Sequence, residues 1–272
     1  MNKDIDMVIT TAADSKYFSQ LMCLIGSLHK SNFDSLTQIY VYNLGLSDSE
    51  RSAINNLQKV TLREVEKTNP DIIRQMQKHP GSNLVSIPGC YSWKPVIIKQ
   101  TLDEYDAVFW MDAGVTVLKS LQPIFEHVKI TGYFFMGTSE LGIWLNKYPM
   151  EKLNVTKVEL ATLGINAGMQ CLNHKYFDTY VLPVYECSKD IKMFVDDGTA
   201  VQGPFGGRHD QSLFNIFAAR NNMKPFYGPN VTLATGQKVC LAGDRSQINN
   251  DTIIYHCRGD GQDNAKFIRK KR

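Results

Sequence analysis

We expect an α/β protein with a mostly parallel central sheet and helices on both faces. Two observations predict it: short apolar runs typical of buried strands alternate with segments whose apolar residues recur at helical spacing, and a carboxylate ends one of those runs. With 272 residues, 43% hydrophobic and 21% charged, the chain suits one large globular domain. We therefore treat residues 1–272 as a single domain.

The first third of the chain predicts repeated strand and helix units. An apolar strand at 6–11 leads through a loop at 12–15 into apolar residues at helical spacing, the opening of a nucleotide-binding βα unit. Neither GxGxxG nor a Walker loop follows the strand. Further elements are expected as a strand at 38–43, a helix from Ser47 to Leu57, a strand at 60–65, a helix starting at Asn69-Pro70 and a loop at 79–83.

The first candidate site residue is Asp112. The apolar run 107–111 ends on it, and Ala113-Gly114 follows before a second run at 115–117. In open α/β sheets, ligands bind at the carboxyl ends of the strands, so an acid at this point is well placed for chemistry. Gly114 permits a close backbone approach. An ordinary turn would use the same residue types.

A helix beginning near Pro95 puts Trp93 and Lys94 at its N-terminus, on the rim of the crevice that receives Asp112. Helix N-termini favour anions, and a lysine there favours phosphate. The alternative is a surface lysine beside a packed tryptophan.

The second half of the chain is harder to interpret. We expect one helix from Glu140 to Tyr148 carrying Trp144, and a loop entering a strand at 164–172. Later elements are expected as a helix at 175–190, a Gly- and Asp-rich loop at 196–207, a helix opened by Asp210 as a candidate N-cap, and a strand at 252–255 that leads to His256. His256 suits metal or phosphate binding, or simple packing.

Composition excludes several classes of protein. A net charge of +3 does not argue for a nucleic-acid partner, although the basic tail 269–272 could be solvated or meet acidic lipid or phosphate. No apolar run reaches 18 residues and the N-terminus lacks signal-peptide features, so we expect a soluble, cytoplasmic protein. The six cysteines are widely spaced and are expected to be reduced.

Four motifs, in order, resemble those of nucleotide-sugar glycosyltransferases of the GT-A fold, in particular family 8, which includes glycogenin. They span most of the chain and lie at 9–17, at Lys94 with 110–114, at 166–168 with 206–211, and at 254–259. The third is similar to the family's NSG and DQ elements and the fourth to its HxxG element. The second has Asp-Ala-Gly where the family has DxD.

This resemblance implies a Rossmann-like GT-A fold with a nucleotide-binding half at 1–120 and a donor-sugar and acceptor half at 121–272. It implies transfer of a hexosyl group from a UDP-sugar, with UDP-glucose or UDP-galactose favoured, to a hydroxyl acceptor with retention. The residues expected to contact the nucleotide-sugar are Thr10, Thr11, Ala12, Asp14, Tyr17, Lys94, Asp112, Ala113, Gly114, His256, Arg258 and Gly259. Those expected to act at the sugar are Asp210, Gln211 and Asn166.

The family holds Mn²⁺ with both acids of DxD and the C-terminal histidine, which maps the metal site onto Asp112 and His256. Gly114 stands where the second acid would be, and a hard cation prefers several oxygen ligands, so the sequence leaves metal dependence open. Gln262 stands where the family has a lysine, and Arg258 could replace its charge.

Two other functions stay open. One is a non-catalytic nucleotide-sugar-binding module, against which Asp210, Gln211 and His256 argue. The other is a sugar nucleotidyltransferase, which would carry a Gly-rich basic signature after its first strand, and 11–17 has none. The acceptor could be a glycan, a protein or a lipid, and a homodimer is also left open.

Overall fold

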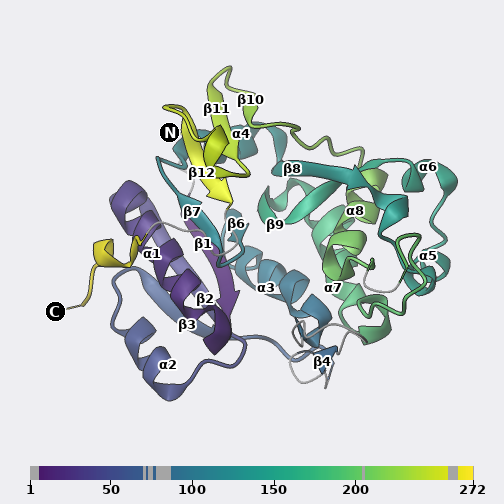
Figure 1. Ribbon diagram of the computed structural model, residues 1–272, viewed down its shortest axis with the longest axis horizontal. Coiled ribbons are helices and arrows are strands. Elements are labelled where there is room, and N and C mark those ends of the chain that lie inside the picture. Colours follow the sequence, from purple (N-terminus) through teal and green to yellow (C-terminus); the bar gives the residue numbers. More distant parts are fainter. Residues whose placement is uncertain are drawn as a thin grey trace.

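The fold is built on a six-stranded mixed sheet in the computed structural model of the chain, which describes residues 6–69, 72, 76–77, 87–203, 206–256 and 263–271. The strand order is β3-β2-β1-β6-β9-β8 (Figure 1). These strands are β1 (Met7–Ala13), β2 (Leu36–Asn43), β3 (Val60–Glu64), β6 (Ala107–Met111), β8 (Tyr133–Glu140) and β9 (Leu163–Asn173). The first four in that order run parallel, and β9 is antiparallel to both β6 and β8.

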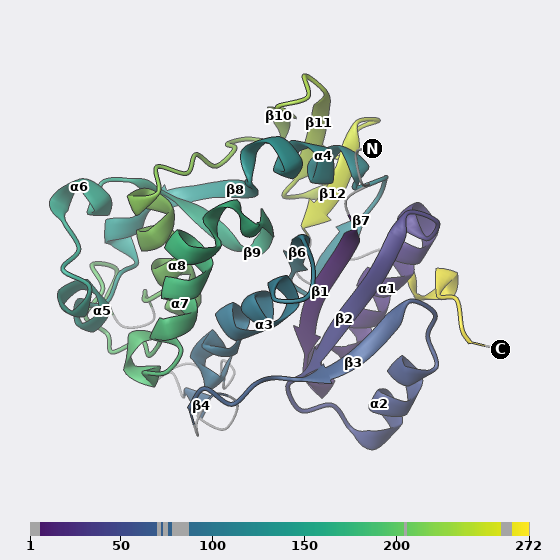
Figure 2. The same ribbon diagram turned by 180° about the vertical axis from the view of Figure 1, so that it is seen from behind.

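Helices cover both faces of this sheet, as the alternation of apolar runs predicts. Along β6, Val108 and Trp110 pack into one core with α3 (Trp93–Leu102), α7 (Leu182–Cys187) and α8 (His209–Arg220), whereas Phe109 and Met111 pack into a second core with α1 (Phe18–Asn32) and α4 (Gln122–Thr131). Successive side chains of a strand point to opposite faces, so a central strand buried on both sides is apolar throughout. Figure 2 shows these helices from behind.

A smaller sheet, of which the sequence predicted only the strand at 252–255, adds to the second core. Its order is β10-β11-β12-β7, formed by β10 (Asn230–Thr232), β11 (Lys238–Ala242), β12 (Thr252–His256) and β7 (Val115–Val117). Because β7 follows β6 after one turn and pairs antiparallel with β12, it brings His256 opposite Val115. The remaining elements are α2 (Asp48–Asn55), α5 (Lys147–Lys152), α6 (Lys157–Leu160) and the hairpin of β4 (Met76–Gln77) with β5 (Ile87–Pro88).

Several expected elements differ from the structure. The single helix expected at 140–148 is wrong: β8 extends to Glu140, because its pairing with β9 continues to Leu163, and a short 3-10 turn (Leu141–Ile143) separates it from α5, which begins at Lys147. The segment 164–172 is strand throughout, within β9. Most of the helix start at 69–70 and the loop at 79–83 lie outside the described residues.

The remaining expectations fare better. The helix expected at 175–190 is a succession of 3-10, π and α turns over His174–Cys187. The described cysteines are all free, as the sequence predicted: Cys23, Cys90, Cys171, Cys187 and Cys240. Across the described ranges, every helix is too short or too polar to cross a bilayer.

The C-terminal segment 263–271 packs against α1 (Figure 1) and forms hydrogen bonds with residues that follow α2. Arg269 donates its backbone N–H to His29 Nδ1 at 3.0 Å, and Lys271 donates its N–H to the Asn56 carbonyl at 2.7 Å. The contact is close because Gly26 has no side chain: a Cβ there would overlap the Asn264 carbonyl. The segment 263–271 is thus bound to α1, the helix of the first βα unit.

Gly26→Ala is expected to destabilise the protein by about 1–3 kcal/mol, as overpacking usually does. In an exposed helix the same change would stabilise by about 0.5–1 kcal/mol. Urea unfolding measures the difference. In a variant truncated after residue 262, Gly26→Ala should no longer lower the free energy of unfolding. An equal loss in the full-length and truncated proteins would contradict the close packing of Gly26 on the C-terminal segment.

Candidate functional site

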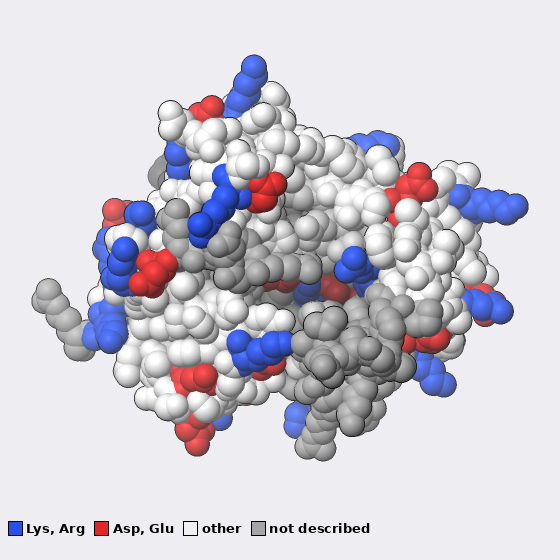
Figure 3. Space-filling model, in the orientation of Figure 1, with Lys and Arg blue, Asp and Glu red and all other residues white. Residues whose placement is uncertain are grey.

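One pocket of about 460 Å³ lies where the carboxyl ends of β1 and β6 meet. Figure 3 shows a hollow near the middle of this face, with blue and red side chains inside it. Parallel strands end at the same edge, which puts the loop after β1 beside Asp112 after β6. Strand β9 runs antiparallel to β6 with Met169 opposite Met111, so Asn166 to Gly168 reach the same edge.

Two helices point their N-termini at this pocket. Lys94 is the second residue of α3, and Asp210 is the second residue of α8. Asp210 is therefore not the N-cap that the sequence suggested: Arg208 occupies that position, without a side-chain cap, and Asp210 is free to face the pocket. The positive end of a helix dipole favours a carboxylate in the first turn.

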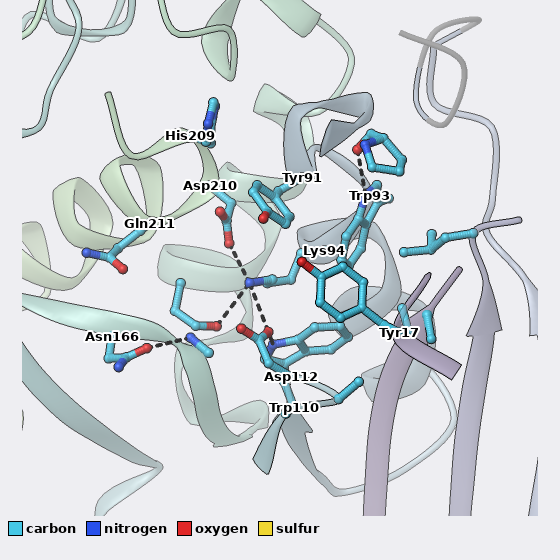
Figure 4. A pocket seen from close by; sticks show the side chains of 18 of the residues that line it. Tyr17, Tyr91, Trp93, Lys94, Trp110, Asp112, Asn166, His209, Asp210 and Gln211 are labelled. Atoms are coloured by element: carbon cyan, nitrogen blue, oxygen red, sulfur yellow. Dashed lines mark hydrogen bonds and ion pairs between the residues drawn. The ribbon is translucent and has the colours of Figure 1, made fainter. Parts of the chain in front are cut away.

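Lys94 joins the two halves of the site (Figure 4). Its Nζ lies 2.8 Å from Asp210 Oδ2, 3.3 Å from Asp112 Oδ1 and 3.3 Å from the Ala167 carbonyl oxygen. The residue is only 3% exposed, and these three acceptors match the three N–H donors of an ammonium group. This geometry favours a role in holding the two carboxylates over direct contact with phosphate.

The charges of this triad depend on one another. Burial alone would lower the pKa of Lys94, but Asp112 and Asp210 outweigh it, so the pKa of the ammonium lies above its ordinary value. Burial raises the pKa of Asp210, and the adjacent Lys94 opposes that shift. Asp112 differs in that its side chain is 36% exposed. The triad thus presents one buried and one accessible carboxylate to the pocket.

Asp112 is held by its surroundings. The Trp110 indole donates Nε1–H to Asp112 Oδ1 at 3.1 Å, and the backbone N–H of Asp112 donates to the Gly168 carbonyl at 2.8 Å. A Cβ on Gly168 would lie 2.9 Å from Asp112 Oδ2 and 3.0 Å from Asn166 Oδ1, closer than atoms pack without shifting. The absence of a side chain at Gly168 therefore leaves room for the Asp112 carboxylate and the Asn166 side chain beside the strand.

Strained backbone surrounds Lys94. Cys90 and Tyr91 have φ of 48° and 62°, and His209 has φ of 35°, in the left-handed region that residues with a Cβ seldom adopt. The Tyr91 ring packs 5.6 Å from His209 and 5.7 Å from Trp93, and His209 Nδ1 lies 2.7 Å from the Phe194 carbonyl oxygen. Burial raises the pKa of Tyr91 to about 12, so its hydroxyl stays protonated. Such strain concentrates at functional sites, where packing sustains it.

Most of the predicted site residues line this pocket. They are Ala12, Asp14, Tyr17, Lys94, Asp112, Ala113, Gly114, Asn166, Asp210, Gln211 and His256. Thr10 and Thr11 do not: both side chains are buried within β1, so we no longer expect them to contact a ligand. Arg258 and Gly259 lie outside the described residues.

Four lining residues lie outside the predicted motifs and the predicted rim at Trp93 and Lys94; they are Gln20, Leu44, Pro88 and Tyr91. Tyr91 carried a signal, because it opens the Tyr-Ser-Trp-Lys-Pro stretch beside Lys94. The other three come from a helix face, a loop and a two-residue strand, and nothing in their local sequence sets them apart.

The described side chains of the pocket offer few ligands for a manganese ion. Asp112 Oδ1 is already engaged by Trp110 and Lys94, Gly114 adds no side chain, and His256 lines the same pocket. Within the described ranges, no three His, Cys, Asp or Glu side chains are placed to share a metal. A hard cation prefers more oxygen ligands than these residues offer, so the described residues do not fit a protein-held Mn²⁺.

Comparison with known proteins supports the predicted fold class. No family model matches the chain, and no curated protein matches it in sequence. Solved structures do match over nearly all of it, and the chain shares its mixed α/β fold with structures that include a xylosyltransferase. At 10–16% identity, this likeness establishes the fold alone.

Among the matching structures are three with TM-scores above 0.5. An active-site mutant of LgtC has TM-score 0.51 and 16% identity and covers 98% of each chain. Mouse xyloside xylosyltransferase 1, in its apo form, has 0.54 and 12%, covering 96% of this chain and 99% of its own. Core-mannan synthase A from Aspergillus fumigatus, in an Mn/GDP form, has 0.55 and 10%, covering 82% and 73%.

Lys94→Met is expected to destabilise the fold by about 3–5 kcal/mol at pH 7, because it leaves two carboxylates without their ammonium partner. The cost should shrink towards pH 4: without Lys94 the pKa of Asp210 rises further, and protonation removes the buried charge. Urea unfolding at pH 8, 6 and 4.5 measures the trend.

The matched control is Lys99→Met on the same helix, whose partner Asp103 is exposed. It should cost less than about 1 kcal/mol, as exposed pairs do. Equal costs at positions 94 and 99, or a cost at 94 that does not change with pH, would contradict the buried triad.

Proposed function

We propose that the protein is a glycosyltransferase that moves a hexosyl group from a UDP-sugar, with UDP-glucose or UDP-galactose favoured, to a hydroxyl acceptor with retention. The observation that carries the proposal is the triad of Lys94, Asp112 and Asp210 in a pocket at the carboxyl ends of β1 and β6. It is supported by a fold shared with proteins named as a xylosyltransferase and a mannan synthase.

The nucleotide end of the site, in this proposal, is the loop after β1. Asp14 accepts a hydrogen bond from the backbone N–H of Tyr17 at 3.2 Å, which fixes the loop, and Tyr17, 42% exposed, lines the pocket. An accessible aromatic ring suits stacking on a base. Ala12, Ala113 and Gly114 leave room for close approach of the ribose and diphosphate. We assign residues 1–120 to nucleotide binding on this basis.

The sugar end is the wall formed by Asn166, Asp210 and Gln211. In the transfer, the anomeric C–O bond to the diphosphate breaks and a bond forms from the acceptor oxygen to the anomeric carbon. The departing phosphate oxygen takes the acceptor proton, so no separate base is needed. Asp210 and Gln211 orient the sugar and offset positive charge on its anomeric carbon.

Lys94 has a supporting part in this scheme. With its three donors directed at Asp112, Asp210 and the Ala167 carbonyl, it holds the carboxylate near the sugar and the one near the diphosphate in fixed relation. A preorganised site of this kind stabilises charge without rearranging during the reaction. We route no step through Mn²⁺, because the described residues offer it too few ligands.

Calorimetric titration with UDP, UDP-glucose and UDP-galactose, each with Mn²⁺ and with a chelator, tests the proposal. Micromolar binding of UDP and of one UDP-sugar is expected, and the chelator arm reveals whether a metal takes part. If none of the three binds under either condition, the proposal is wrong. Binding without release of UDP on incubation with acceptors would instead favour the alternative, a non-catalytic nucleotide-sugar-binding module.

Asp112→Asn and Asp210→Asn should each lower UDP release from the bound UDP-sugar by about 10²-fold or more, because each removes a charge from the reacting region. Asp178→Asn, at an exposed acid that does not line the pocket, is the matched control. Thermal unfolding confirms that each variant is folded. Turnover at the wild-type rate in either pocket variant would refute the assignment.

A further inference from the structure

The wall of the pocket at the start of α8 carries a second charged group, Arg208, which the scheme above does not use. Arg208 is exposed and lines the pocket, directly before His209, Asp210 and Gln211. Figure 4 shows that helix on one side of the pocket and Tyr17 with the β1 ribbon on the other. Arg208 directly precedes His209, Asp210 and Gln211 and is exposed where Asp210 is buried, so it belongs to the outer part of the proposed sugar wall.

The Arg208 guanidinium is held over an aromatic ring. Its Cζ lies 4.4 Å from the centroid of the Trp144 ring, within cation–π distance. The indole is fixed in turn, because Trp144 Nε1 donates to Ser139 Oγ at 2.6 Å. The backbone N–H of Arg208 and the hydroxyl of Ser212 both donate to the Trp144 carbonyl oxygen, at 3.2 and 3.1 Å. The guanidinium is therefore preorganised at the rim of the pocket.

The positive charge of Arg208 differs from that of Lys94. Lys94 lies between the carboxylates of Asp112 and Asp210, whose negative charges compensate its positive charge. No described carboxylate lies within ion-pair distance of Arg208, whose described partners are the Trp144 ring and carbonyl. A planar guanidinium pairs with two oxygens of a carboxylate or phosphate at once and is weakly hydrated, which suits it to recognise an anion.

We propose that Arg208, held on Trp144, is the recognition group of the acceptor subsite, and that the acceptor carries an anionic group, a carboxylate or a phosphate, beside its reacting hydroxyl. The inference rests on the proposed function, which assigns one end of the pocket to the nucleotide and the other to the sugar. Binding of an anionic sugar at Arg208 can nevertheless be measured by itself.

The test titrates the protein, with and without saturating UDP, with glucuronic acid, glucose 6-phosphate and glucose. At least one anionic sugar should bind about tenfold or more tightly than glucose, and its affinity should fall as salt is raised. Which of the two binds better distinguishes a carboxylate from a phosphate. If neither is preferred to glucose in either state, the proposal is overturned.

Arg208→Ala should abolish the preference for the anionic sugar and leave UDP affinity within about twofold. Trp144→Leu should reduce the preference in part, because the guanidinium loses its platform, whereas Lys192→Ala, an exposed lysine that does not line the pocket, should preserve it. A preference that survives Arg208→Ala contradicts the proposal. So does a tenfold loss of UDP affinity in that variant, which would make Arg208 a ligand of the diphosphate.

The two proposals fail in different ways. Absence of UDP binding by the wild-type protein overturns the glycosyltransferase assignment, and the sugar titrations without UDP still decide whether Arg208 recognises an anion. Normal UDP binding with no anionic preference overturns only the acceptor inference.

Discussion

A buried lysine between two carboxylates is the interaction on which this site depends. Lys94, Asp112 and Asp210 come from α3, from the turn after β6 and from α8, and their contacts fix three elements that are far apart in the sequence. Removing one member of a buried charged group leaves the others without compensation, so each constrains the rest. The arrangement holds the two proposed functional ends of the pocket at a set separation.

The backbone around the triad accommodates this constraint at a cost. Three residues with side chains, Cys90, Tyr91 and His209, adopt left-handed conformations on the two segments that lead into α3 and α8. Each such conformation costs of the order of 1–2 kcal/mol. The Tyr91 ring packs on Trp93 and His209 at the same place. Because Gly168 has no side chain, β9 can approach the Asp112 carboxylate closely. Strain and close packing meet at the same pocket.

Sequence patterns predicted the elements whose periodicity is strong and whose role is local. Apolar spacing predicted the first βα unit and the strand that leads to Asp112, and the position of Pro95 predicted α3, the helix that precedes this strand in the chain. The segment around Trp144 was misjudged because its conformation depends on pairing between β8 and β9, a contact between distant parts of the chain. Most of the small second sheet escaped prediction for the same reason.

The same contrast between local patterns and long-range contacts holds for the site residues. The order of the motifs predicted most of the residues that line the pocket, but not the side chains and carbonyl groups that they contact. That Lys94 is saturated by protein acceptors, or that Arg208 rests on Trp144, depends on the three-dimensional path of α3 and α8. Thr10 and Thr11 belonged to the right motif yet are buried within β1, because consecutive residues of a central strand face two cores.

The most direct test of this account is a crystal structure of the protein with UDP bound. We expect the uracil beside Asp14 and Tyr17, the diphosphate near Ala113 and Gly114, and Lys94 still between Asp112 and Asp210 without touching a phosphate oxygen. UDP bound elsewhere, or a Lys94 that leaves Asp210 to contact the diphosphate, would contradict the claim that the buried triad organises the site.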